Sequence, residues 1–160
     1  MTTTRDQDDA SALDLDGFLC FAIYSAGHAF NQLYRPLLDG IGLTYPQYLV
    51  MVALWKRDDQ TVKEIGQRLH LDSSTLTPLL KRLEGLGHIS RNRDPSDERQ
   101  VRLRLTEQGS ALREKALAIP SCIGEATGLS PEHLRRLIKE ITTARENILS
   151  LGRKDADADD

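Results

Sequence analysis

Residues 61–105 read TVKEIGQRLHLDSSTLTPLLKRLEGLGHISRNRDPSDERQVRLRL, and this stretch decides the fold. Thr61 is followed three positions later by Glu64, the pattern of a capping box, which predicts a helix to about residue 69. Asp72 is typical of a second cap, and the helix that it opens is expected to run to about Leu86 and to stop at Gly87. Two short helices joined by a tight turn predict a helix-turn-helix.

The segment after these helices has the pattern of a basic hairpin. Residues 99–105 alternate polar and apolar, the period of a half-buried strand. They are separated from the basic run at residues 88–93 by a turn that contains Pro95 and two aspartates, which favours a hairpin. A basic hairpin directly after a helix-turn-helix predicts a winged helix.

The flanking segments predict long helices. Residues 13–39 form one apolar-rich run that ends at Asp39 and Gly40, and its apolar side chains cover more than one face, which suggests an interface between subunits. Further helices are expected from Thr44, from Thr106 to about Ile119, and from Ser130 onward. The predicted fold class is therefore mainly α with a small β-hairpin wing: a winged helix-turn-helix with N- and C-terminal dimerisation helices.

The predicted domain organisation is a single domain between two tails. Residues 1–12 and 152–160 are expected to be disordered, the latter as an acidic tail, because clustered acids with few apolar residues cannot offset the entropy of ordering. Residues 13–151 form the domain, with the winged helix at about 44–106 and dimerisation helices at about 13–40 and 107–151.

Composition narrows the class of protein. The formal net charge of the 160 residues is −3, yet the window from Lys81 to Arg104 holds seven basic and four acidic residues, so that it is +3 and the remainder −6. The distribution of charge matters more than its sum, and it favours nucleic acid as a partner. The N-terminus lacks the features of a signal peptide and no apolar run reaches about 18 residues, which predicts a cytoplasmic protein. The two cysteines, Cys20 and Cys122, form no metal-ligand pattern, and no metal or cofactor is expected.

Candidate DNA contacts lie on the second helix of the pair and in the hairpin. The helix offers short polar side chains that reach bases or phosphates and two cations, opposite an apolar stripe. In the hairpin, Asp94 and Asp97 are candidates to hold an arginine in place as wing support. The spacing does not decide which arginine enters the minor groove, although Arg99 at the tip is favoured, with Arg91 and Arg93 on the DNA backbone. The predicted DNA-binding residues are Ser73, Ser74, Thr75, Thr77, Pro78, Lys81, Arg82, Arg91, Arg93 and Arg99.

Residues 13 to 122 resemble the MarR family of winged-helix repressors. The resemblance rests on the run from Leu43 to Gly109, which includes DPSDER at 94–99 and LTEQG at 105–109. Within that family the chain is similar to the organic hydroperoxide resistance regulators (OhrR), on the stretches LCFAIY at 19–24, YRPLL at 34–38, LTYPQYLVM at 43–51 and LDSSTLTPLLKRLE at 71–84.

The resemblance implies a homodimer on pseudo-palindromic double-stranded DNA and a redox switch. It implies that Cys20 is the cysteine oxidised by peroxide and that Tyr34 and Tyr45 reach it from the other subunit, with Tyr24 in the same set. It also implies the two-Cys type, in which Cys122 supplies the resolving thiol. If Asp16 is the cap of the first helix, Cys20 lies near its first turn, where the helix dipole favours an anion. The apolar neighbours Phe18, Leu19 and Phe21 suit an organic hydroperoxide.

Three hypotheses follow for function. The first is a thiol-based repressor in which an organic hydroperoxide oxidises Cys20, a disulfide with Cys122 or with a small thiol forms, and DNA is released to derepress a peroxide-resistance gene. In the second, a small aromatic ligand between the subunits releases DNA and both cysteines are incidental. The third, a peroxidase that uses Cys20, is disfavoured because the chain shows no paired acid and base, metal site or phosphate loop, so that a regulator and not an enzyme is expected.

Overall fold

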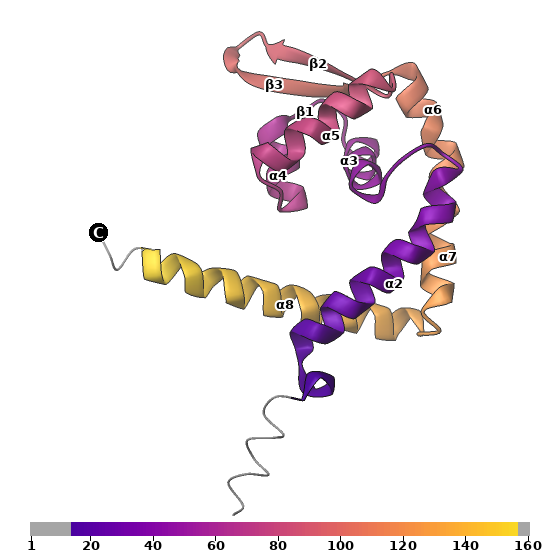
Figure 1. Ribbon diagram of the computed structural model, residues 1–160. Coiled ribbons are helices and arrows are strands. Elements are labelled where there is room, and N and C mark those ends of the chain that lie inside the picture. Colours follow the sequence, from indigo (N-terminus) through magenta and orange to yellow (C-terminus); the bar gives the residue numbers. More distant parts are fainter. Residues whose placement is uncertain (1–13, 157–160) are drawn as a thin grey trace, which may run out of the picture. The chain divides into compact units, whose positions relative to one another are not determined.

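The computed structural model describes residues 14–156, with side chains over residues 14–151 (Figure 1). The chain forms two compact units, divided between Leu117 and Ala118. The predicted tail at residues 1–12 lies outside the described residues. None of the helices in the described part of the chain is long and apolar enough to cross a lipid bilayer.

The first unit holds the winged helix. Its elements in chain order are the short turn η1 (Leu15–Gly17), α2 (Leu19–Asp39), α3 (Tyr45–Lys56), β1 (Gln60–Thr61), α4 (Val62–Leu69), α5 (Ser73–Gly85), β2 (Ile89–Asp94), β3 (Asp97–Leu105) and α6 (Glu107–Ala116). The second unit holds α7 (Ile119–Ala126) and α8 (Pro131–Ala156). The predicted fold class, mainly α with a small β wing, is confirmed.

The helix starts are set by the caps that the sequence indicates. The Thr61 hydroxyl accepts a hydrogen bond from the Glu64 backbone at 3.1 Å, and the Glu64 carboxylate accepts one from the Thr61 backbone at 2.7 Å, which completes the capping box of α4. Asp72 caps α5 by accepting from the backbone of Thr75 at 2.8 Å. Gly87, just beyond α5, has a φ of 76°, the left-handed conformation that ends the helix before the wing.

The wing is part of a three-stranded antiparallel sheet. The strand order is β1-β3-β2, with Ile89 opposite Leu105 in the hairpin and Gln60 opposite Leu103 at the other edge. The strand β1 was not predicted, because two residues carry no readable alternation. Beneath the sheet, α3, α4, α5 and β3 form one core of fully buried side chains: Val50, Met51, Leu54, Ile65, Leu80, Leu83 and Leu103.

Three predicted boundaries were wrong. The first helix begins at Leu19 and not at residue 13, because Asp14 caps a separate short turn and Phe18 is extended, with φ −91° and ψ 113°. The helix from Glu107 ends at Ala116 rather than near Ile119, since Pro120 has no N–H for the Ala116 carbonyl. Pro120 lies instead in the first turn of α7, which was not predicted.

The predicted C-terminal tail also begins too early. Helix α8 continues to Ala156, so residues 152–156, expected to be disordered, have helical backbone. Gly152, a residue that often ends helices, lies within this helix and does not end it, and no proline follows Leu151. Residues 157–160 lie outside the described part.

Candidate DNA interface and thiol site

Helix α5 presents the polar face that the sequence predicts. Leu76, Leu80 and Leu83 are buried on one side. The residues exposed on the helix are Ser73, Ser74, Thr75, Pro78, Lys81 and Arg82, whereas Thr77 is half-buried. Two of the hydroxyls already donate within the helix, Ser74 to the Asp72 carboxylate at 2.6 Å and Thr77 to the Ser73 carbonyl at 2.7 Å. Lys81 and Arg82 are therefore the freest groups of this face for contacts with phosphate or bases.

The two aspartates of the wing organise its tip. Asp94 accepts from the Ser96 hydroxyl at 2.6 Å, from the Ser96 backbone at 2.8 Å and from Arg102 at 2.9 Å. These bonds, the Ser96 hydroxyl first, hold the pKa of Asp94 well below its usual range, so that the carboxylate stays charged. Asp97 accepts from the Arg99 backbone at 3.1 Å. The hairpin is thus held by its own acids, as a rigid wing requires.

The three predicted wing arginines differ in their surroundings. Arg93 and Arg99 are exposed, and neither forms an ion pair within the described residues. Arg91 is half-buried and lies 3.6 Å from Glu84 of α5, and its Nε is buried without a hydrogen-bond partner among the described residues. Arg93 and Arg99 are thus the wing cations that are free for contacts outside the chain, while Arg91 lies against α5.

Sequence reasoning missed the brace at the base of the wing. Arg102 bridges two acids: its Nε lies 2.6 Å from Asp59 and its Nη1 2.9 Å from Asp94. Asp59 also accepts from Arg104, at 3.0 Å, and these two arginines, Arg104 first, lower its pKa. Asp59 has a φ of 53°, a left-handed conformation that aspartate tolerates better than most residues. The Asp58-Asp59 pair just after a helix was the available signal.

The tyrosines gather around the start of α3. The rings of Tyr34 and Tyr45 lie 4.5 Å apart, and those of Tyr34 and Tyr48 lie 6.0 Å apart. Burial, with smaller contributions from Tyr45 and Tyr48, raises the pKa of Tyr34 to about 12, and burial also raises the pKa values of Tyr45 and Tyr48. The hydroxyls therefore stay protonated and remain donors. Tyr48 was not predicted, since it reads as part of an apolar helix body.

Tyr24 lies outside this cluster. It is 65% exposed, and its ring packs edge-on against His28 with centroids 4.5 Å apart. The structure therefore brings together two of the three predicted tyrosines and adds a third, Tyr48.

Both cysteines are free and exposed. Cys20 is the second residue of α2, whose N-cap is Phe18 and not Asp16, the cap considered in the sequence analysis. Cys20 therefore lies two residues nearer the helix start than an Asp16 cap would place it, where free backbone N–H groups and the dipole favour an anion. Cys122 lies in α7 of the second unit.

Cys20 and the tyrosine cluster are far apart within one chain. Tyr34 follows Cys20 by 14 residues on the same helix, which at the rise of an α-helix corresponds to about 21 Å along its axis. No side-chain reorientation spans this separation. Tyr34 and Tyr45 can therefore meet a Cys20 sulfur only if it comes from another copy of the chain.

A helix-turn-helix whose exposed face carries free cations, followed by a braced basic wing, defines a winged-helix DNA-binding regulator. Comparison with known proteins extends this conclusion. Residues 32–116, more than half of the chain, match the family model described as transcriptional regulator SarA/Rot. The HTH-type transcriptional regulator TtmR of Methylorubrum extorquens is 49% identical over 142 residues, which cover 89% of this chain and 72% of the relative. The organic hydroperoxide resistance transcriptional regulator of Bacillus subtilis is 43% identical over 136 residues, covering 85% of this chain and 92% of the relative.

Solved structures give the same result. The structure of reduced AbfR bound to DNA matches with a TM-score of 0.70 and 37% identity, over 82% of this chain and 93% of that one. A structure of disulfide-formed AbfR, a Staphylococcus epidermidis protein, matches with a TM-score of 0.62 and 36% identity, over 89% and 98%. The chain belongs to the MarR/SarA family of winged-helix transcriptional regulators, and within it to the OhrR type. The predicted family is confirmed.

Proposed function

We propose that the chain acts in the cytoplasm as a homodimeric repressor, a regulator and not an enzyme, whose hold on operator DNA is released when an organic hydroperoxide oxidises Cys20. The observation that carries this proposal is the separation of about 21 Å along α2 between Cys20 and Tyr34. Three protonated tyrosine hydroxyls gather at one end of this helix, and an exposed thiol lies in the first turn at the other end. Among the residues that the structure describes in one chain, the thiol and the hydroxyls do not meet, and a second copy placed antiparallel would bring them together.

Exposed apolar side chains support the dimer. Helix α2 leaves Leu19 61%, Tyr24 65% and Phe30 40% exposed, so its apolar faces are uncovered within one chain. Helix α8 exposes a second set at helical spacing: Leu137, Ile138, Ile141, Ile148 and Leu151. Surfaces of this kind mark protein interfaces. A two-fold dimer would place its two α5 helices in major-groove half-sites about 34 Å apart on pseudo-palindromic DNA.

The proposed chemistry has two balanced steps. The Cys20 thiolate attacks the peroxide, the O–O bond breaks, the alcohol leaves, and sulfur becomes a sulfenic acid. A second thiol then forms a disulfide with this sulfur and expels water. We propose the Cys122 thiol of the partner subunit for this step. The AbfR structures support it, because they include a reduced form bound to DNA and a disulfide-formed state. The oxidised dimer would no longer fit both half-sites at once.

The DNA contacts proposed for each subunit follow the free cations. Lys81 and Arg82 of α5, with the hydroxyl residues of its first turns, would enter the major groove. Arg99, and Arg93 beside it, would reach the minor groove and the backbone from the wing, held by Asp94 and Asp97.

The test uses a labelled duplex whose sequence is taken from the DNA that flanks the encoding gene. Fluorescence anisotropy measures its release from the protein. Cumene hydroperoxide is expected to release the wild-type protein at lower concentration than hydrogen peroxide, and dithiothreitol is expected to restore binding. Cys20→Ser should bind DNA and ignore both oxidants. The matched control is Cys122→Ser, which should still be oxidised at Cys20 but form no disulfide, as non-reducing mass spectrometry of the intact protein would show. Release of Cys20→Ser by peroxide would overturn the proposal, and release by an aromatic acid alone would favour the ligand-controlled alternative.

A further inference from the structure

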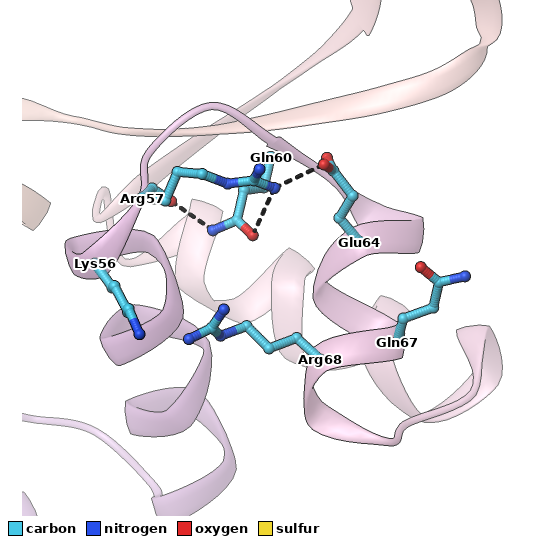
Figure 2. Close-up of a pocket in the computed structure, with 6 residues that line it drawn as sticks. All are labelled: Lys56, Arg57, Gln60, Glu64, Gln67 and Arg68. Atoms are coloured by element: carbon cyan, nitrogen blue, oxygen red, sulfur yellow. Dashed lines mark hydrogen bonds and ion pairs between the residues drawn. The ribbon is translucent and has the colours of Figure 1, made fainter.

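An open hollow of about 510 Å³ lies between the end of α3 and the outer face of α4, away from the tyrosine cluster. It is lined by Lys56, Arg57, Gln60, Glu64, Gln67 and Arg68 (Figure 2). Three of these six side chains are cations and one is an acid. The proposed DNA and redox sites use none of them.

One half of the hollow is internally paired. Arg57 donates to Glu64 at 2.6 Å and to the Gln60 amide oxygen at 3.3 Å. Gln60 is 2% exposed, and its amide nitrogen donates to the Ala53 carbonyl at 3.0 Å. Glu64 also accepts from the Thr61 backbone and hydroxyl, and these bonds, the backbone bond first, lower its pKa. Glu64 therefore stays charged and balances Arg57, and this half is held fixed.

The other half carries uncompensated positive charge. Lys56 and Arg68 form no ion pair with any residue that the structure describes, and Figure 2 shows both side chains directed into the same hollow, one from each helix. Each lies in the last turn of its helix, where the dipole favours a cation. The helix dipoles explain why each position favours a cation. They do not explain why two cations share one hollow in which the single acid, Glu64, is already paired with Arg57.

From these contacts we propose that the hollow binds a phosphate group between Lys56 and Arg68. Arg68 supplies the planar fork of donors that matches phosphate oxygens, and Lys56 supplies a compact second charge. The Gln67 side-chain amide also lines the hollow and forms no hydrogen bond with the residues that the structure describes. The phosphate group could come from a DNA backbone, beyond the contacts of α5 and the wing, or from a free phosphate-bearing molecule. Both sources present negatively charged phosphate oxygens to the same two cations: a DNA phosphodiester carries one negative charge, and a free phosphate group carries one or two.

The first measurement separates these sources with DNA. The variant is Lys56→Ala/Arg68→Ala, and the matched control is Arg113→Ala/Lys115→Ala, which removes two exposed cations from the last turn of α6. If a DNA phosphate occupies the hollow, the variant should lose affinity equally for the flanking duplex and for an unrelated duplex. The slope of log K against log salt should then fall by about 1 for each lost phosphate contact, while the control keeps the wild-type slope.

The second measurement uses inorganic phosphate and the full-length protein. If the slope is unchanged, phosphate titrated into the wild type should shift the backbone amide NMR signals of positions 67 and 68, and it should leave the signals of the same two positions unmoved in the variant. The proposal is overturned if neither the slope nor these signals respond, or if the control changes as much as the variant. The DNA measurement rests on the proposed function: a wild type that binds no duplex would count against that function, while the phosphate titration would still test the hollow.

Discussion

The winged helix and the long helices use their apolar residues in opposite ways. In the winged helix, Leu54, Ile65 and Leu103 are fully buried within one chain, and most of the arginines at the base of the wing are paired with acids. In α2 and α8 the large apolar residues are largely uncovered, with Tyr24 65% and Ile148 67% exposed. In the winged helix, the core apolar side chains and most of the arginines at the base of the wing find their partners within one chain. In α2 and α8, many apolar side chains are not covered by the described part of a single chain. Each subunit therefore folds its own winged helix, and we infer that redox sensing and the pairing of two winged helices on DNA both need a second subunit.

The largest expected effect is on the stability of the winged helix, the self-contained region of the two. A Cβ added at Gly109 would lie 1.9 Å from the His88 carbonyl oxygen, at the point where α6 packs against the base of β2. Since the obstacle is backbone, Gly109→Ala should cost about 3 kcal/mol or more of unfolding free energy. Urea unfolding followed by the fluorescence of Trp55, the single tryptophan of the chain, measures it.

The matched control for this substitution is Gly27→Ala in α2. Nothing lies within 4 Å of a Cβ at Gly27 in the single chain. This change should therefore raise stability by up to about 1 kcal/mol through helix propensity. A destabilised Gly27→Ala dimer would instead reveal close backbone contact with the partner at that position, and a wild-type-like Gly109→Ala would contradict the packing described for the wing.

The next effect falls on the exposed apolar face of α8. Ile138→Glu places a charge in a surface that we expect to be covered in the dimer, where an unpaired charge is costly. The dimer dissociation constant should rise at least 100-fold, or about 2.7 kcal/mol, as measured by analytical ultracentrifugation. The monomer should keep the unfolding transition of its winged helix.

Lys139→Glu is the control, since it changes the charge of the neighbouring exposed residue without removing an apolar contact. It should leave the dimer within about threefold of the wild type. If Ile138→Glu stays dimeric as well, α8 is not the interface and the contrast between the two regions is weakened.

These contrasts also explain which parts of the fold could be predicted from the sequence alone. Caps at Thr61, Asp72 and Thr106 and the alternation of residues 99–105 are local signals, and the elements that they predict are confirmed. The brace from Arg102 to Asp59 joins residues 43 positions apart, and such pairing follows from the folded sheet and not from any short pattern.

The tyrosines show a second limit. Tyr48 belongs to the cluster because α3 turns it toward Tyr34, but in the sequence it lies in an apolar run like any core aromatic. The structure places Tyr34 and Tyr45 side by side, while their predicted contact with Cys20 and the roles of both cysteines stay predictions. A partner subunit cannot be seen in one chain's periodicity, which reveals only that a face is apolar.

A smaller effect is expected on the pH dependence of the self-contained region. Ser96, and then Arg102, lower the pKa of Asp94 below its ordinary value of 3.8. A group with a lowered pKa in the folded state stabilises that state above its unfolded pKa and loses this contribution as the pH falls through its folded value. The stability difference between wild type and Asp94→Asn should therefore be constant from pH 8 to about pH 5 and shrink below about pH 4.

Urea unfolding at pH 3 to 7 measures this difference, with Asp97→Asn as the matched substitution at the other wing aspartate. No stability difference at pH 7 between wild type and Asp94→Asn would show that the bonds of Asp94 shape the tip without stabilising the fold.

The smallest expected effect lies inside the self-contained region, at a hydrogen bond between α3 and α6. The Trp55 indole donates to the Gly109 carbonyl at 2.9 Å, and its ring lies 6.3 Å from that of Tyr48. Trp55→Phe keeps an aromatic ring but removes this hydrogen bond, which should cost about 1 kcal/mol, measured by urea unfolding with circular dichroism. Val52→Ala, at a 40% exposed position of the same helix, should change stability by less than about half as much. Because Trp55 links the helix that carries Tyr45 and Tyr48 to the base of the wing, a loss well above this value would mean that the tyrosine cluster and the wing unfold as one unit. A loss near zero would instead show that this hydrogen bond does not couple α3 to the base of the wing.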